Sequence, residues 1–114
     1  MDMKYYHNLY ASESLQFKKK IIIDDLKNEK LYINLYIIVL TKNEQNHLEF
    51  YDSALLRQKV FRKEDLFVVG IAEGYSGAVE VVERIVQDVC ERTNSTDIRN
   101  YIINSQQEFE ERNK

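Results

Sequence analysis

The segment that most constrains the fold is a ten-residue apolar run, residues 31–40, which reads LYINLYIIVL and is interrupted only by Asn34. The run is rich in β-branched and aromatic residues and contains neither Gly nor Pro, so it predicts a β-strand. Its second half is continuously apolar, which is typical of a strand with both faces covered, as in a parallel α/β sheet. The run has about half of the ~20 residues that a membrane-spanning helix needs, so we expect no membrane association.

A second strand is predicted over residues 66–69, LFVV, which continue into Gly70 and Ile71. Between the two strands, residues 47–59 have apolar side chains at helical spacing, and the sequence NHLE from Asn46 resembles a capping box. A strand, a helix and a second strand form a βαβ unit, whose strands are parallel and whose crossover is right-handed. We therefore expect both strands to end at the same edge of the sheet.

Three further segments have the periodicity of amphipathic helices. The clearest runs from Ala78 to about Asn94, and another begins near Ile98. The first of the three spans about residues 12–28, and its apolar face is expected to carry Leu15, Phe17, Ile21, Ile22 and Leu26. A strand over Lys20–Asp25 is the competing interpretation, because this segment contains three consecutive isoleucines. The helix is the favoured one of the two.

The predicted order of elements is α-β-α-β-α-α in a single domain over residues 1–114, with residues 1–11 and 108–114 peripheral or frayed. Two strands make a very small sheet with two open edges. Either Lys20–Asp25 adds a third strand, which would make the fold α+β rather than α/β, or a second copy of the chain completes or covers the sheet. Because two-fold symmetric dimers are the commonest soluble oligomers, we predict a homodimer.

Glycine occurs only at the predicted junction between the second strand and the Ala78 helix. The 114 residues include no proline and three glycines, Gly70, Gly74 and Gly77. Ligands of open α/β sheets bind beyond the strand ends, and helix N-termini bind anions. The spacing G-x-x-x-G-x-x-G matches neither the dinucleotide fingerprint nor the Walker motif, and Glu73 would repel a phosphate. The favoured interpretation is structural: Gly70 ends the strand, Gly74 permits the turn and Gly77 allows close packing.

If the two strands are parallel, the segment after residue 40 faces this junction across a crevice. The candidate ligand-binding residues of the crevice are Thr41, Lys42, Asn43, Glu73, Gly74, Tyr75 and Ser76. Lys42 could pair with an anion, Asn43 and Ser76 could form hydrogen bonds, and Tyr75 could stack on a ring. This constellation is the one candidate binding site that the sequence indicates.

No catalytic residue, metal site or cofactor is predicted. His47 lies near Glu44 and Glu49, but no nucleophile or substrate proton is identifiable for it to act on. His7 is the only other histidine, and without an H-E-x-x-H pattern or a cysteine pair the two do not form a zinc motif. The single Cys90 excludes an intramolecular disulfide and is expected to be a half-buried apolar residue.

The charge of the chain argues against nucleic acid as a partner, because the formal net charge is −3 and nucleic-acid binders usually present a clustered basic face. The strongest basic run, Lys18–Lys20, is soon followed by Asp24 and Asp25, so it is expected to be a solvated helix face. The N-terminal residues show no signal-peptide pattern, and we expect a cytoplasmic protein.

Taken as a whole, these patterns predict a small non-catalytic binding or interaction module, in which a second copy or another protein is the partner. The alternative is a small-anion or nucleotide-binding domain that uses the junction over residues 70–77.

Overall fold

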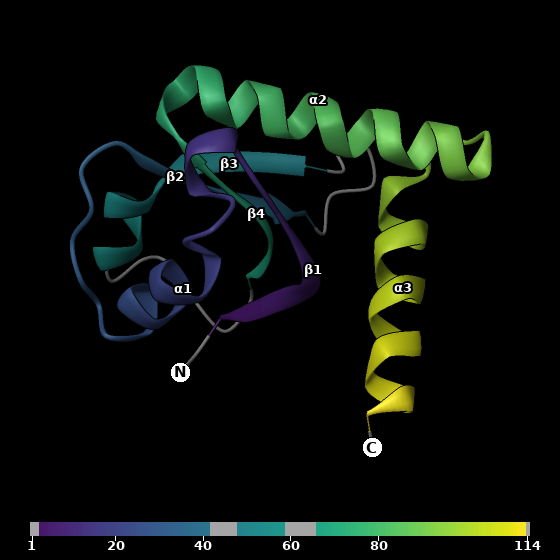
Figure 1. Cartoon of the computed structure of the whole chain (residues 1–114), viewed down its shortest axis with the longest axis horizontal. Helices are drawn as coiled ribbons and strands as arrows, with labels where there is room; N and C mark the ends of the chain where they lie inside the picture. Colours follow the sequence, from purple (N-terminus) through teal and green to yellow (C-terminus); the bar gives the residue numbers. More distant parts are fainter. Residues whose placement is uncertain (1–2, 42–47, 59–65, 114) are drawn as a thin grey trace.

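The computed structural model describes residues 3–41, 48–58 and 66–113, which form a small α+β domain (Figure 1). The strands are β1 (Lys4–Ala11), β2 (Leu35–Leu40), β3 (Leu48–Asp52) and β4 (Phe67–Glu73). The α-helices are α1 (Lys19–Lys27), α2 (Gly74–Thr93) and α3 (Ile98–Arg112), and two short 3-10 helices are η1 (Glu13–Leu15) and η2 (Ser53–Arg57). None of the described helices is long and apolar enough to span a membrane.

The strands form one mixed sheet in the order β1-β4-β2-β3. β4 is parallel to β1 and antiparallel to β2, and β3 is also antiparallel to β2. The predicted parallel βαβ unit is therefore wrong, since Leu35 at the start of β2 pairs with Glu73 at the end of β4. The predicted order of elements fails for the same reason. An additional strand, β3, follows β2 and reverses the chain, and β4 then runs in the direction of β3.

The helix predicted over residues 47–59 is wrong in its described part, because residues 48–52 form β3 and residues 53–57 form η2. Over so short a stretch the apolar spacing of Leu48 and Tyr51 is compatible with either period. Backbone hydrogen bonding to β2, with Tyr51 opposite Ile37, decides in favour of a strand. Tertiary pairing thus overrides the local helical pattern.

Both faces of β2 are buried by helices of the same chain. Leu35, Ile37 and Val39 belong to the apolar cluster that contains the α1 side chains. Ile38 and Leu40 point to the other face and belong to the cluster that contains the α2 and α3 side chains. Figure 1 shows α1 and α2 on opposite sides of the sheet. The prediction of a covered strand is confirmed, but no second copy is needed to cover it.

The structure also decides between helix and strand for Lys20–Asp25, which lies within α1. The fold is α+β because residues 4–11 and 48–52 supply two further strands, not because Lys20–Asp25 does. The predicted helix from Ala78 is confirmed, although α2 begins four residues earlier, at Gly74. It ends at Thr93, and its C-cap residue Asn94 has a left-handed φ of 54°.

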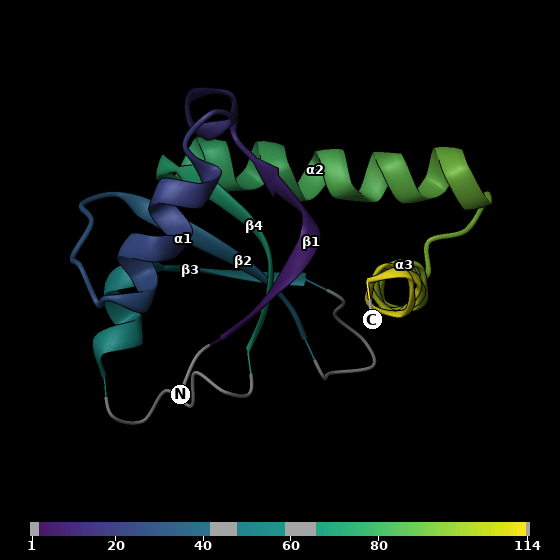
Figure 2. The same cartoon turned by 60° about the horizontal axis from the view of Figure 1, so that its bottom comes forward.

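Residues 4–11 form the edge strand β1, and α3, which is seen end-on in Figure 2, packs beside this edge. The backbone N–H of His7 donates a hydrogen bond of 2.8 Å to Oε1 of Gln106 in α3. Ile102 of α3 is buried in the same cluster as Tyr6 of β1. A helix placed here supplies partners to the edge of the sheet and protects it from pairing with another chain.

Candidate functional site

The glycine junction between β4 and α2 is closely packed. Gly70 lies inside β4 and does not end the strand, contrary to the prediction. A Cβ atom on Gly70 would come within 2.9 Å of Val81 Cγ1. Gly74 has a φ of +74°, which favours glycine, as the predicted turn requires. Gly77 faces Ser12, whose Cβ would lie 3.4 Å from an added methyl group. The positive φ of Gly74 therefore supports its predicted role in the turn, whereas the close approach belongs to Gly70 and Gly77 has ordinary packing room.

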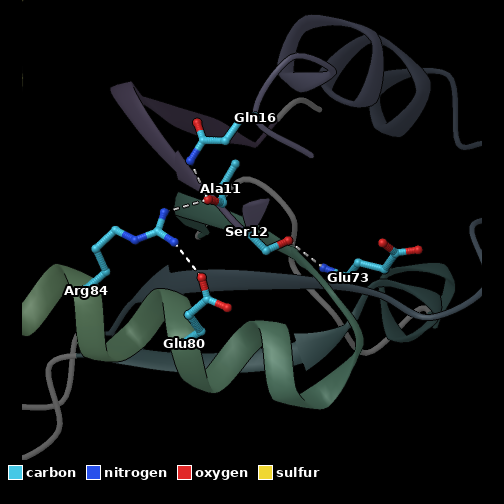
Figure 3. Close-up of polar contacts among 6 residues, drawn as sticks. All are labelled: Ala11, Ser12, Gln16, Glu73, Glu80 and Arg84. Carbon is cyan, nitrogen blue, oxygen red and sulfur yellow. Dashed lines mark hydrogen bonds and ion pairs between the residues drawn. The ribbon is translucent and has the colours of Figure 1, made fainter. Parts of the chain in front are cut away.

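The polar groups around this junction bind one another, as Figure 3 shows. The backbone N–H of Glu73 donates to Oγ of Ser12 at 3.0 Å. The carbonyl oxygen of Ala11, at the end of β1, accepts hydrogen bonds of 2.8 Å from both Gln16 Nε2 and Arg84 Nη1. Arg84 also forms an ion pair with Glu80 one turn away along α2. This network fixes the end of β1 to the end of β4 through Glu73 and to the middle of α2 through Arg84.

The predicted crevice does not form from the residues expected. Thr41 follows β2 directly, at the end where Val39 pairs with Val68, whereas Glu73 pairs with Leu35 at the other end. Thr41 is therefore separated from Glu73 and Gly74 by the length of strand β2. Lys42 and Asn43 lie outside the described residues, as do Glu44 and His47.

Segments other than the predicted one surround Glu73, Gly74 and Tyr75. Ser14 Oγ donates a hydrogen bond of 2.6 Å to the Glu73 carboxylate. The N–H of Gly74 donates to the carbonyl oxygen of Asn34 at 2.8 Å. The Tyr75 ring packs edge-on against Phe50, at 5.4 Å between centroids. The fourth predicted residue of the junction, Ser76, is exposed. The junction thus faces residues 31–35 and η1.

An apolar groove of about 200 Å³ lies where the junction, α1 and residues 32–35 meet. Its lining includes the buried Leu15, Ile22 and Leu35 and the half-buried Tyr32. Two charged residues, Lys18 and Glu73, also line it. Of the five predicted site residues that the structure describes, Glu73 is the one that lines this groove.

Large apolar side chains are exposed in and beside the groove. Ile21 and Ile33 line it and are 61% and 92% exposed. Phe17, which precedes Lys18, is 100% exposed, and Leu31, which precedes Tyr32, is 61% exposed. We call these four side chains, together with the groove, the groove patch. Exposed apolar surface of this extent marks interaction sites in folded proteins.

The sequence did not indicate the groove patch, because all four residues fit the apolar pattern of predicted elements. Phe17 and Ile21 widen the apolar face of the first helix, and Leu31 and Ile33 belong to the predicted strand. In the structure Phe17 precedes α1, and β2 begins only at Leu35. An apolar pattern shows which residues gain from burial, but it cannot tell whether the covering element is in the same chain.

The groove is held in place from both sides. The Tyr32 hydroxyl donates a hydrogen bond to the Asp25 carboxylate of α1. This bond, together with Lys30 Nζ at 3.4 Å, lowers the pKa of the Asp25 carboxyl, and the same bond raises the pKa of Tyr32. On the other side, the carbonyl of Asn34 holds Gly74 at the start of α2. Residues 32–34 are therefore held by contacts within the chain.

A second cluster that the sequence did not reveal joins β1 to α3. The Tyr6 hydroxyl donates to Ser105 Oγ at 2.9 Å, and the same Oγ lies 2.9 Å from His7 Nε2. The His7 ring stacks on Phe109 with 4.5 Å between centroids. Burial, and secondarily the charge of Arg112, lowers the pKa of His7. Since 98 positions separate His7 from Ser105, no local motif could have indicated the pair.

A serine hydrogen-bonded to a neutral histidine is half of a nucleophilic site. Ser105, however, lies within α3, where the backbone N–H groups are already used by the helix, so they cannot form an oxyanion hole. The contacts instead fasten α3 to β1. In the described ranges no group of three or more His, Cys, Asp or Glu side chains is placed to hold a metal ion.

Comparisons of the chain with protein-family models, with curated proteins and with solved structures found no match. The function is therefore inferred from the geometry described above.

Proposed function

We propose that this domain is a non-catalytic interaction module that binds a protein chain through the groove patch. The observation that supports the proposal is a formed apolar groove whose lining includes the exposed Ile21 and Ile33. Two more exposed apolar residues, Phe17 and Leu31, directly precede the lining residues Lys18 and Tyr32 in the chain. Burying one such side chain contributes about 1.5–3 kcal/mol. Burial of the patch by a partner would therefore stabilise a complex.

The size of the groove favours a protein partner over a small ligand. Sites for drug-sized molecules usually enclose about 300–1,000 Å³, whereas this groove has about 200 Å³. A space of that size suits one apolar side chain of a partner, an anchor of the kind found at the centre of protein interfaces. The fixed position of residues 32–34 lowers the entropic cost of such binding.

The alternative function, binding of a small anion or nucleotide at residues 70–77, has weaker support. The Gly74 N–H, which would meet an anion at the start of α2, donates to Asn34. The Glu73 carboxylate precedes the helix and would repel a phosphate there. Tyr75, Ser76 and Arg84 line a hollow of about 490 Å³ along α2, but Arg84 is already bound to Glu80 and to the Ala11 carbonyl, and Glu80 and Glu83 add negative charge to the lining.

The proposal can be tested by selecting peptides from a random display library on the purified chain. We expect the selected peptides to carry an apolar anchor, because an apolar groove rewards one. Ile33→Asp places a charge in the groove and should weaken their binding about tenfold or more. The matched control is Ile103→Asp, at an exposed position of α3 away from the groove.

The two variants give the selection a clear outcome. Binding that is lost in Ile33→Asp and kept in Ile103→Asp supports the proposal. Peptides that bind both variants as well as the unsubstituted chain, or a library from which nothing is enriched, would contradict it. Circular dichroism of both variants shows whether each is folded.

A further inference from the structure

We infer that the occupant of the groove patch is a second copy of this chain, related to the first by a two-fold axis through the groove. The inference rests on the proposed function and names its partner. It differs from the dimer that the sequence suggests, because the sheet faces are already covered by α1 and α2 and the contact lies elsewhere.

The shape of the patch suits contact with itself. In a two-fold symmetric interface the same surface meets on both copies, so it must carry both projections and hollows. The groove patch has projections in Phe17 and Ile33, which are almost fully exposed. It has a hollow in the groove of about 200 Å³ that Ile33 itself lines. An apolar projection of one copy can therefore fill the groove of the other, and the reverse contact follows by symmetry.

The charges of the groove are also self-complementary. Lys18 lies at the start of α1 and Glu73 at the end of β4, and both line the groove. Among the described residues neither has an ion-pair partner, and Glu73 accepts a hydrogen bond from the neutral Ser14 hydroxyl. A two-fold axis between Lys18 and Glu73 brings the lysine of each copy to the glutamate of the other. One symmetric contact thus forms two ion pairs across the interface.

The area available matches a weak, reversible dimer. The four exposed side chains of the patch offer apolar surface on the order of 500 Å² per copy. The total for two copies, about 1,000 Å², is at the lower limit for a specific interface. We therefore expect dissociation in the micromolar range, with monomers at low concentration and dimers at high concentration.

The test is sedimentation equilibrium of the full chain from about 5 to 500 μM, spanning the expected micromolar dissociation constant. The unsubstituted chain should show a concentration-dependent dimer. Phe17→Asp should weaken the dimer about tenfold or more, because each interface buries the new charge twice. Lys19→Glu is the matched control for changes at Lys18, since Lys19 is the neighbouring lysine and does not line the groove.

A charge exchange tests the pairing itself. Lys18→Glu alone and Glu73→Lys alone should each weaken the dimer about tenfold, because like charges then face each other twice. The double variant restores opposite charges and should return the dissociation constant to within about threefold of the original. Thermal unfolding of each variant separates loss of pairing from loss of folding. If Glu73→Lys fails to fold, Glu73→Gln gives a second test, because Lys18→Glu should then weaken the Glu73→Gln dimer less than it weakens the original one.

Several outcomes would overturn the inference. A chain that stays monomeric to about 500 μM rules out the dimer at any useful strength. A dimer that Phe17→Asp leaves unchanged uses another surface, such as the β3 edge. If Lys18→Glu and Glu73→Lys each weaken the dimer but the double variant does not restore it, the proposed ion pair between Lys18 and Glu73 is contradicted. If the chain is monomeric while selected peptides still bind the groove, the inference fails and the proposed function stands.

Discussion

Val81 of α2 lies directly against Gly70 of β4, so close that a Cβ atom on Gly70 would come within 2.9 Å of Val81 Cγ1. β4 is an inner strand of the sheet, between β1 and β2. The absence of a side chain at residue 70 therefore sets how near α2 approaches the sheet. Because α2 starts directly after Glu73, this approach also positions the Glu73 side of the groove.

Adding a methyl group at Gly70 is expected to destabilise the fold. Gly70→Ala forces Val81 or the helix to move, and overpacking of this kind costs about 1–3 kcal/mol of unfolding free energy. Gly77→Ala is the control, because its methyl group has ordinary room at 3.4 Å from Ser12 and alanine favours the helix by about 0.5–1 kcal/mol. Urea unfolding should show a loss for the first variant and no loss for the second. Equal losses would contradict this account of the two glycines.

Gly74→Ala is expected to lower the unfolding free energy by about 1–2 kcal/mol, because a left-handed backbone is unfavourable for residues with a Cβ atom. The φ of Gly74 is +74°, and Asn34 Nδ2 would lie 3.2 Å from the added methyl group. Ser76→Ala, at an exposed position of the same helix, serves as the control and should change stability little. The measurement is again urea unfolding, and a Gly74→Ala protein as stable as the control would show that the turn is not strained.

Removing the Gln106 side chain is expected to loosen α3 from β1. Gln106 is buried, and its Oε1 accepts the N–H of His7. In Gln106→Ala this donor of the edge strand loses its partner, at a cost of about 1–3 kcal/mol. Gln107→Ala is the control, since Gln107 is the adjacent, exposed residue of the same type. Amide hydrogen exchange should show faster exchange at His7 in the first variant alone, and equal exchange in the two would contradict the prediction.

The attachment of α3 is also expected to depend on pH through His7. Its pKa is lowered in the folded chain, chiefly by burial and then by Arg112. The unfolded chain therefore binds more protons between the folded pKa and the unfolded value of about 6.5. Stability is complete above that window and falls as the pH drops through it. His7→Gln cannot titrate, so its stability should fall less between pH 7.5 and 5.5. Urea unfolding at these pH values checks this, and equal falls in both proteins would refute it.

Local sequence patterns predicted the elements whose stability depends on local spacing. α2 was predicted because its valines recur at helical intervals, and α1 because Ile22 and Leu26 share one face. β2 was predicted from its apolar, β-branched composition. The strand at residues 48–52 was missed, because its hydrogen-bond partners lie outside the segment, in β2, and this pairing outweighs its helical spacing.

The candidate site was predicted only in part. Glu73 belongs to the groove, but its expected neighbour Thr41 lies at the other end of β2, because β2 and β4 are antiparallel. The direction of a strand depends on what precedes and follows it, and a short apolar segment carries no sign of direction. The contact of His7 with Ser105 could not be predicted either, because the two residues lie near opposite ends of the chain and no local pattern links them.

The sequence alone determined that residues 35–40 need cover on both faces and that glycine is confined to one strand-to-helix junction, because burial and backbone freedom are properties of individual residues. Only the tertiary structure decided what provides that cover. It buries Ile22 under the sheet and leaves its neighbour Ile21 and the nearby Ile33 exposed. The hydrophobic effect has no direction, so it rewards burial of all three equally. Packing geometry decides which of them is buried within the chain and which stays exposed on its surface.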